Sequence, residues 1–188
     1  PYTTLFRSVI GDSTFLHSGI APLMNMAYNQ SDALIIILDN STTAMTGMQE
    51  HPGTGYTLMG KETKKVNLNI LISALGIENI RVIDPNNVKE ARIAIKDELA
   101  SSGPSVIIAQ SPCVLFKRAN QKPKPPLKVD PDACEGCRAC LELNCPPIAW
   151  KKGVTKEGSK RKGIAEIDET LCNGCGLCAQ VCKFGAIG

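Results

Sequence analysis

Eight of the nine cysteines in this chain of 188 residues fall into two clusters near its end. In each cluster, two residues separate the first three cysteines, and the fourth follows after three or four more. Thiolates at such short spacing lie on one loop and can bind the same metal centre. The first cluster contains Cys134, Cys137, Cys140 and Cys145, and the second contains Cys172, Cys175, Cys178 and Cys182.

This spacing resembles the cysteine run of bacterial ferredoxins, in which three thiolates hold one [4Fe–4S] cube and the fourth binds the other cube. The resemblance implies two cubes, and therefore the transfer of single electrons. Lys183 replaces the usual proline after the second run, but that proline is not a ligand. The implied ligand sets are Cys134, Cys137, Cys140 and Cys182 for cluster 1, and Cys172, Cys175, Cys178 and Cys145 for cluster 2.

Two other uses of these cysteines were considered. Paired CxxC motifs often bind zinc, but zinc needs only two short-spaced pairs and has no use for the third close thiol in each run. Disulfides are typical of secreted chains, and no signal peptide precedes the motifs. Iron–sulfur clusters are therefore the favoured prediction.

A second candidate site lies in the first half of the chain. The residues Gly11, Asp12 and Ser13 follow one predicted strand, and Asp39 and Asn40 follow the next. Because the carboxyl ends of parallel strands meet at one crevice, these side chains are expected to converge. The oxygens of a carboxylate and an amide suit Mg²⁺, and a glycine allows a diphosphate to approach the backbone.

This pattern resembles the motif of thiamine-dependent enzymes, which is written GDG followed by NN after a gap of this length. Here Ser13 replaces the third glycine and Asp39 the first asparagine. The resemblance implies that Asp12, Asn40 and the backbone carbonyl of Thr42 bind Mg²⁺, and that Gly11, Asp12, Ser13, Asn40 and Thr42 form the site of thiamine diphosphate.

Short apolar runs alternate with amphipathic ones from Val9 to Phe116, which predicts a parallel sheet covered by helices on both faces. The expected strands are 8–10, 33–38, 80–83 and 105–109, and the expected helices are 17–29, 65–75 and 87–101. The helix beginning near His17 or Ser18 is expected to point its amides at the diphosphate.

The fold class is therefore α/β: part of a thiamine diphosphate-binding domain at 9–116, followed by a small α+β domain of the ferredoxin type with two clusters at 128–188. Residues 117–127 are rich in proline and cations and are predicted to be a linker. Residues 1–8, PYTTLFRS, resemble a translated sequencing adapter and are excluded from the predicted fold. They suggest a carboxy-terminal fragment of a longer protein.

The stretches GDSTFLHSGI and NSTTAMTGMQEHPGTG, with the two cysteine runs, resemble the large subunit of indolepyruvate:ferredoxin oxidoreductases. That family oxidatively decarboxylates aryl 2-oxo acids such as indolepyruvate and phenylpyruvate, with coenzyme A as acyl acceptor and an external ferredoxin as electron acceptor. It pairs the large subunit with a smaller beta subunit. The glutamate that activates thiamine diphosphate lies in another domain of that family, so this chain alone is expected to be inactive.

Two other functions were kept open. One is a related oxidoreductase for pyruvate or branched-chain 2-oxo acids, and the other is a non-catalytic electron carrier. His17 and His51 are candidate catalytic residues, with helix packing and a solvated turn as their simpler roles. The basic segment Lys151–Gly163, with Lys160, Arg161 and Lys162, is either a docking site for an acidic ferredoxin or a solvated loop.

The net charge of +3 would be offset by roughly four negative charges from two cubes with their thiolates, so nucleic acid binding has no support. The longest fully apolar run, Ala33–Leu38, is too short to span a membrane. Free thiols indicate a reducing compartment, and we expect the cytoplasm.

Overall fold

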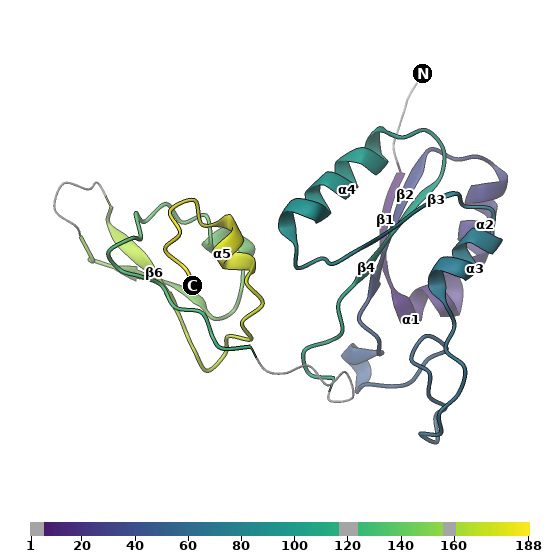
Figure 1. Ribbon diagram of the computed structural model, residues 1–188, viewed down its shortest axis with the longest axis horizontal. Coiled ribbons are helices and arrows are strands. Elements are labelled where there is room, and N and C mark those ends of the chain that lie inside the picture. Colours follow the sequence, from purple (N-terminus) through teal and green to yellow (C-terminus); the bar gives the residue numbers. More distant parts are fainter. Residues whose placement is uncertain (1–5, 117–123, 156–160) are drawn as a thin grey trace. The chain divides into compact units, whose positions relative to one another are not determined.

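The computed structural model describes residues 6–116, 124–155 and 161–188. The chain forms two compact units, Pro1–Asn120 and Gln121–Gly188 (Figure 1). Most of the predicted linker, at 117–123, lies outside the described residues, as does the middle of the basic segment at 156–160.

The first unit contains a four-stranded parallel sheet in the order β1-β2-β4-β3. The two central strands, β2 and β4, are the most apolar of the four, as expected for strands that are covered on both faces. The strands are β1 (Phe6–Gly11), β2 (Ala33–Asp39), β3 (Asn79–Ile83) and β4 (Ser105–Gln110). The predicted parallel sheet is thus confirmed.

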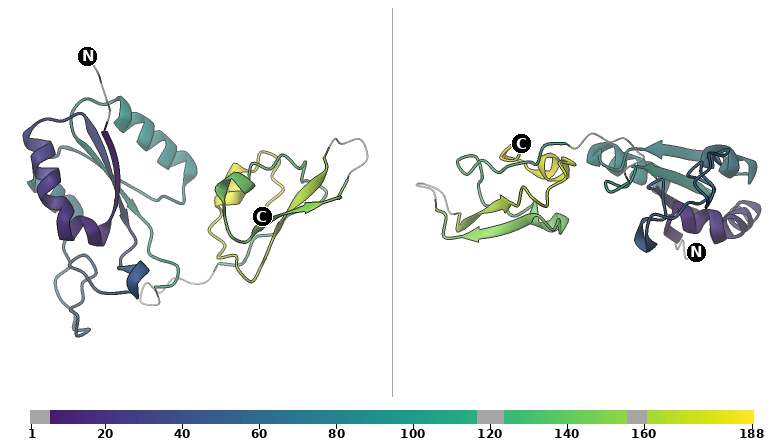
Figure 2. Two further views of the ribbon diagram at one scale, coloured as in Figure 1. Left: turned by 180° about the vertical axis from the view of Figure 1, so that it is seen from behind. Right: turned by 90° about the horizontal axis from the view of Figure 1, so that it is seen from below.

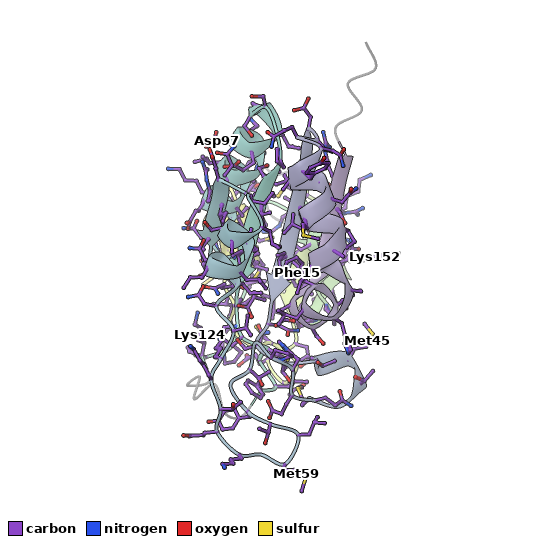
Figure 3. The ribbon with its side chains drawn as sticks, turned by 90° about the vertical axis from the view of Figure 1, so that its right-hand side faces the viewer. Phe15, Met45, Met59, Asp97, Lys124 and Lys152 are labelled. Carbon is purple, nitrogen blue, oxygen red and sulfur yellow. The ribbon has the colours of Figure 1, made fainter. Side chains whose placement is uncertain are left out.

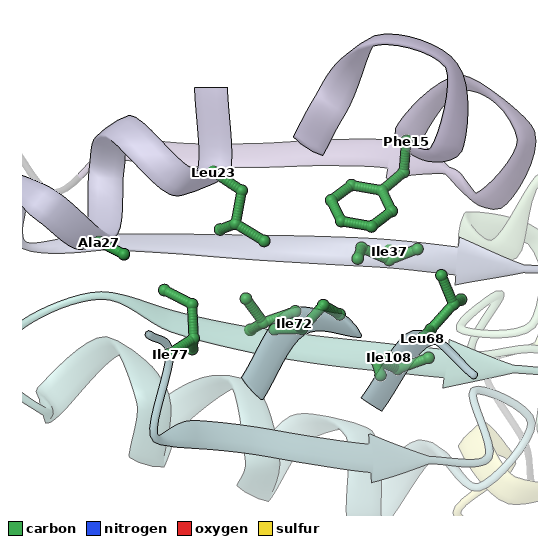
Figure 4. Packing of buried hydrophobic residues seen from close by; sticks show 9 residues of the cluster. Phe15, Leu23, Ala27, Ile37, Leu68, Ile72, Ile77 and Ile108 are labelled. Carbon is green, nitrogen blue, oxygen red and sulfur yellow. The ribbon is translucent and has the colours of Figure 1, made fainter. Parts of the chain in front are cut away.

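Helices cover both faces of this sheet (Figures 1 and 4). On one face, α2 (Ile20–Tyr28) and α3 (Leu68–Ala74) pack on the sheet, and α4 (Val88–Ala100) packs on the other. The connection from β1 to β2 and the connection from β3 to β4 cross the sheet in opposite directions, and their helices lie on opposite faces. The two connections therefore have the same hand, as expected if both follow the right-handed rule for parallel strands. The core of the first face contains Phe15, Leu23, Ala27, Ile37, Leu68, Ile72, Ile77, Val106 and Ile108.

The first helical segment begins earlier than predicted. It runs without a break through α1 (Asp12–Thr14), a π-helical turn η1 (Phe15–Gly19) and α2. Pro22 lies in the first turn of α2 and has no N–H to donate to the carbonyl of Ser18, so a wide turn before it is tolerated. The predicted start near His17 was therefore wrong, and the helix begins at Asp12.

Residues that the sequence analysis excluded also belong to the sheet. Phe6, Arg7 and Ser8 pair with Ala33, Leu34 and Ile35 as the first half of β1. Leaving Phe6 and Arg7 out of the strand was wrong, because pairing along an edge strand uses the main chain and accepts many side chains. The resemblance of 1–8 to an adapter stays a prediction.

The second unit contains an antiparallel pair, β5 (Ile148–Lys152) with β6 (Gly163–Ile167), packed against the short helix α5 (Leu177–Val181) (Figure 2). Its two halves repeat the same backbone pattern. Ile148 pairs with Ile167, and Val129 pairs with Ile187, so the end of each half lies beside the start of the other. Among the described residues, no helix is long and apolar enough to cross a lipid bilayer.

Candidate functional site

The carboxyl ends of three adjacent strands bring polar residues together in the first unit. Gly11, at the end of β1, lies opposite Leu38, and Asp39, at the end of β2, lies opposite Gln110 at the end of β4. The two motifs thus lie at one edge of the sheet, as the sequence predicted. Gln110 was missed, although it directly follows the last of the four predicted strands, 105–109.

Asp12 is the centre of this edge. Its carboxylate is 2 % exposed. The backbone N–H of Ser13 donates to Oδ1 at 2.7 Å, and the backbone N–H of Ser41 donates to Oδ2 at 3.0 Å. The loop after β2 therefore holds the carboxylate that begins the first helix.

A second buried carboxylate, Asp39, lies beside Asp12. It accepts hydrogen bonds from the backbone of Ser41 at 3.1 Å and from the side chain of Gln110 at 2.9 Å. Burial, and next the neighbouring Asp39, raise the pKa of Asp12 above its ordinary value, although the Ser13 amide and His51 oppose the change. Two buried carboxylates in contact are suited to a divalent cation, which would neutralise their charge.

His51 is buried against Asp12. Its Nδ1 accepts a hydrogen bond from the backbone N–H of Gly53 at 3.1 Å, so the proton of the neutral ring is on Nε2. That nitrogen lies 3.4 Å from Oδ2 of Asp12. The solvated-turn interpretation of His51 was therefore wrong, and this imidazole supports the carboxylate from the side.

The other residues predicted to bind thiamine diphosphate and Mg²⁺ lie next to Asp12. The side-chain oxygen of Asn40 accepts a hydrogen bond from the backbone of Thr42 at 3.2 Å, and Thr42 is buried. Ser13 accepts a hydrogen bond from the hydroxyl of Thr43 at 2.8 Å. A side chain at Gly11 would meet no atom within 4 Å, which leaves its backbone open to a ligand. The residues present fit a cation with a diphosphate.

A cavity of about 480 Å³ opens at this edge of the sheet. Asp12 is the one predicted cofactor residue that lines it, together with His51 and Asp39. Lys65 and Asn67 line its other side and were not predicted, because they precede α3 and have no motif of their own. The positive charge of Lys65 in the wall of this cavity suits an anionic ligand.

The structure does not bring His17 into this cavity. Its side chain is exposed on η1, and its catalytic role stays a prediction. The loop between β2 and α3 also presents apolar side chains outward, with Met45 97% and Met59 93% exposed (Figure 3).

Each predicted set of four cysteines surrounds one cavity in the second unit. The first cavity is lined by Cys134, Cys137, Cys140 and Cys182, and the second by Cys145, Cys172, Cys175 and Cys178. The crosswise exchange of the fourth cysteine, expected from the ferredoxin pattern, is thus present in the geometry. This exchange is possible because the end of each half pairs with the start of the other half.

The electrostatics of the thiols agree with this grouping. Burial, and also the neighbouring thiols of Cys134, Cys137 and Cys182, raise the pKa of Cys140. Burial, and then Cys175 and Cys172, raise the pKa of Cys145. Within the described ranges, no three His, Cys, Asp or Glu side chains are close enough to hold a single metal ion. A cube has a separate iron for each thiolate and does not require this.

The basic segment is not a solvated loop throughout. Lys151 and Lys152 belong to β5, and Gly163 begins β6. Arg161 is 9% exposed, and one of its terminal nitrogens donates to the carbonyls of Pro131 at 2.6 Å and Cys134 at 2.5 Å. The solvated-loop interpretation was therefore wrong for Arg161, because these carbonyls hold it against the first cysteine loop, and docking of a ferredoxin by this segment stays a prediction. Lys160 lies outside the described residues.

Replacing Gly136 by alanine is expected to disrupt the first cysteine loop. Gly136 has a φ of +67°, and a Cβ there would lie 2.7 Å from the carbonyl oxygen of Gly163. Gly153 has a φ of +81°, and its Cβ would meet nothing within 4 Å. G153A should cost only the left-handed strain, about 1–2 kcal/mol. G136A should cost more and reduce bound iron; equal unfolding free energies and equal iron contents for both variants would contradict this.

Two family models match the chain. "Thiamine pyrophosphate enzyme, C-terminal TPP binding domain" matches residues 5–109, and "4Fe-4S binding domain" matches residues 165–188. The first covers most of the unit that contains Asp12, and the second covers the second cysteine run.

Curated relatives match almost the whole chain. It is 40% identical over 184 residues to indolepyruvate oxidoreductase subunit IorA of Pyrococcus horikoshii, covering 95% of this chain and 27% of that protein. The same subunit of Archaeoglobus fulgidus is 39% identical over 184 residues, covering 96% and 28%. The chain thus spans about a quarter of the length of these relatives. A solved 2-oxoglutarate:ferredoxin oxidoreductase from Magnetococcus marinus overlays with a TM-score of 0.49 at 13% identity, covering 96% of this chain and 77% of that chain.

Proposed function

Because this chain belongs to the thiamine pyrophosphate enzymes through their C-terminal TPP-binding domain, we propose that it takes part in the oxidative decarboxylation of 2-oxo acids with ferredoxin as electron acceptor. The observation that carries the proposal is the combination of two sites in one chain. Buried carboxylates lie at the strand ends of the first unit, and two cavities with four thiols each lie in the second.

In the first unit, the side chains of Asp12 and Asn40 and the carbonyl of Thr42 would hold Mg²⁺ with the diphosphate. Ser13 and Ser41 fix the carboxylate of Asp12 through their amides, at 2.7 and 3.0 Å. When bound, thiamine diphosphate supplies an electron sink for the charge left as carbon dioxide departs. His51 and Asp39, both buried, exclude water from the back of the carboxylate and keep it oriented.

In the second unit, the cysteine sets 134, 137, 140 and 182, and 145, 172, 175 and 178, would each hold a [4Fe–4S] cube. Oxidation of a 2-oxo acid to an acyl group releases two electrons, and two cubes accept one electron each. The protein's contribution is to keep both thiolate sets in one unit, joined by the chain to the domain where the electrons are released.

The finer assignment concerns the substrates and partners. We propose that the 2-oxo acids are aryl ones, indolepyruvate or phenylpyruvate, that coenzyme A accepts the acyl group, and that a smaller beta subunit and an external ferredoxin are the partners, in the cytoplasm. The names of the curated relatives support indolepyruvate. His17, exposed on the first helical segment, would meet substrate only if another part of the assembly closes over it.

The test is an anaerobic assay of the product of the whole gene with its partner subunit, following viologen reduction with a panel of 2-oxo acids. We expect rates with indolepyruvate and phenylpyruvate to exceed the rate with pyruvate by about tenfold or more, the factor that corresponds to 1.4 kcal/mol of transition-state discrimination, and to require coenzyme A. A preference for pyruvate or branched-chain acids would keep the mechanism and change the substrate. No reduction despite a full iron content would indicate an electron carrier instead.

A further inference from the structure

The two cysteine loops are equivalent in their backbone. Gly136 in the first loop and Gly174 in the second have the same φ of +67°. A Cβ on Gly136 would meet the carbonyl of Gly163, and a Cβ on Gly174 would meet the carbonyl of Pro125. Each loop is therefore covered by the segment that precedes the other half. The two loops share this glycine turn, although a 3-10 turn (Leu141–Leu143) follows the first and α5 begins within the second.

Arg161 breaks this symmetry on the covering segment. Its Cβ would lie 3.0 Å from a Cβ on Gly136, and its guanidinium bonds the carbonyl of Cys134, a ligand of cluster 1. The residue that covers the second loop, Lys124, is exposed. A buried charge acts through a lower dielectric than an exposed one, so Arg161 has the larger effect of the two.

Arg138 breaks the symmetry on the loop itself. It has a φ of +65°, and the residue at the same position of the second loop is Gly176, with a φ of +83°. The guanidinium of Arg138 lies 4.4 Å from the ring centre of Trp150, which lines the first cavity. Glycine at the second site provides no such charge.

Other charges near the first site act in both directions. The anionic Glu135 lines the first cavity with Arg138, whereas Lys183, which follows Cys182, adds an exposed cation. The described residues that line the second cavity include no Asp, Glu, Lys or Arg. Arg161 is the buried cation of the first site, so it contributes most to the difference between the two sites, and the exposed Arg138 contributes less.

We propose that Arg161, assisted by Arg138, makes cluster 1 the cube of higher reduction potential, on which a transferred electron comes to rest. This inference rests on the proposed function, because it requires two cubes. A nearby cation stabilises the reduced cube, which is more negative than the oxidised one. One electron would pass from reduced cluster 2, which becomes oxidised, to oxidised cluster 1, which becomes reduced. No bond forms or breaks, and no proton moves. Cys137 is exposed, so an external acceptor could reach this cube from the side of that thiol.

The experiment is a redox titration of the iron-loaded chain, followed by electron paramagnetic resonance, for the native sequence and R161Q. The control is K151Q, which removes a cation from the exposed face of β5, where Lys151 pairs with Glu166 at 3.2 Å. We expect two reduction waves in the native chain. In R161Q the potential of the higher-potential wave should decrease toward that of the other wave by about 59 mV or more, which is a tenfold change in the one-electron equilibrium. K151Q should leave the separation unchanged.

The variant R138Q covers the case in which R161Q fails to load iron, because Arg138 is exposed and its replacement gives up only the contact with Trp150. It should lower the same wave by a smaller amount. A shift of the lower wave alone, or an equal shift of both waves, would overturn the inference while the clusters stand. If the native chain binds fewer than two cubes, about eight irons and eight sulfides, the proposed cluster function itself fails and the inference with it.

Discussion

Replacing Asp12 by asparagine should reduce the affinity for Mg²⁺ and thiamine diphosphate by more than about 100-fold. Loss of a residue that only orients a metal ligand costs up to about that factor, and loss of a ligand itself should cost more. The substitution keeps the shape of the side chain and one acceptor oxygen, but it removes the charge that a divalent cation needs. Both carboxylate oxygens already accept backbone hydrogen bonds, one from Ser13 and one from Ser41. The measurement is calorimetric titration of the whole gene product with the cofactor in the presence of Mg²⁺.

The same substitution should change how the stability of the fold depends on pH. Burial, and next Asp39, raise the pKa of Asp12 above its ordinary value of 3.8, so the folded chain without cofactor binds more protons than the unfolded chain between those two pKa values. Its stability therefore falls as the pH rises through that interval. D12N has no such carboxylate and should lose this pH dependence, which thermal melts of both chains across that pH interval would measure.

The matched control is D39N, which removes the neighbouring buried carboxylate. Asp39 stands where the thiamine motif usually has asparagine, so D39N should retain cofactor binding to within about tenfold, or 1.4 kcal/mol. If D12N bound the cofactor as well as D39N does, Asp12 would not be the magnesium ligand. If D12N unfolded, its carboxylate would have a purely structural role.

Removing iron should unfold the second unit and leave the first folded. The described residues of the second unit form one small buried cluster, Cys140, Ala165, Cys178 and Ile187, and two of these four are proposed cluster ligands. So small a core stabilises little without a metal. For such sites the free energy of metal binding is the free energy of folding. The first unit has larger apolar clusters on both faces of its sheet.

Scanning calorimetry of the loaded and the stripped chain would measure this, with Mg²⁺ restored after the chelator is removed. We expect two transitions with iron and one without. The variant C113S is the control, because Cys113 is the one cysteine outside the two sets and is half-buried in the first unit. It should keep both transitions. Two transitions in the stripped chain, at unchanged temperatures, would show that the second unit folds without its clusters.

The strands of the first unit were predictable because they are nearly continuous apolar runs with clear ends. The apolar stretch at 33–38 became β2, and Asn87 begins α4 by accepting a hydrogen bond from the N–H of Glu90 at 3.2 Å. The start of the first helical segment was not predictable in this way. Asp12 begins a helix while its side chain serves the site, and the π-helical turn before Pro22 has no signature in the periodicity.

The grouping of the cysteines around two cavities was expected from the resemblance to the ferredoxin run, in which the fourth thiolate binds the other cluster. The neighbours of the sites were not. His51 looked like part of a glycine-rich turn, and Arg161 like one more cation in a basic loop. Both are buried, because contacts with residues far away in the chain, Asp12 and Pro131, hold them. Such contacts depend on the tertiary fold, and local sequence does not reveal them.

The crosswise sharing of cysteines also determines when the clusters can form during synthesis. A ribosome makes the chain from its amino end, so Cys134, Cys137 and Cys140 emerge long before Cys182, which completes their set. Cys145 likewise waits for Cys178. If these sets hold the proposed cubes, neither cube can be completed on the first half alone, and both become possible within four residues of translation. Until then the four thiols of the first run have no complete ligand set, so they are open to oxidation while the rest of the chain is made.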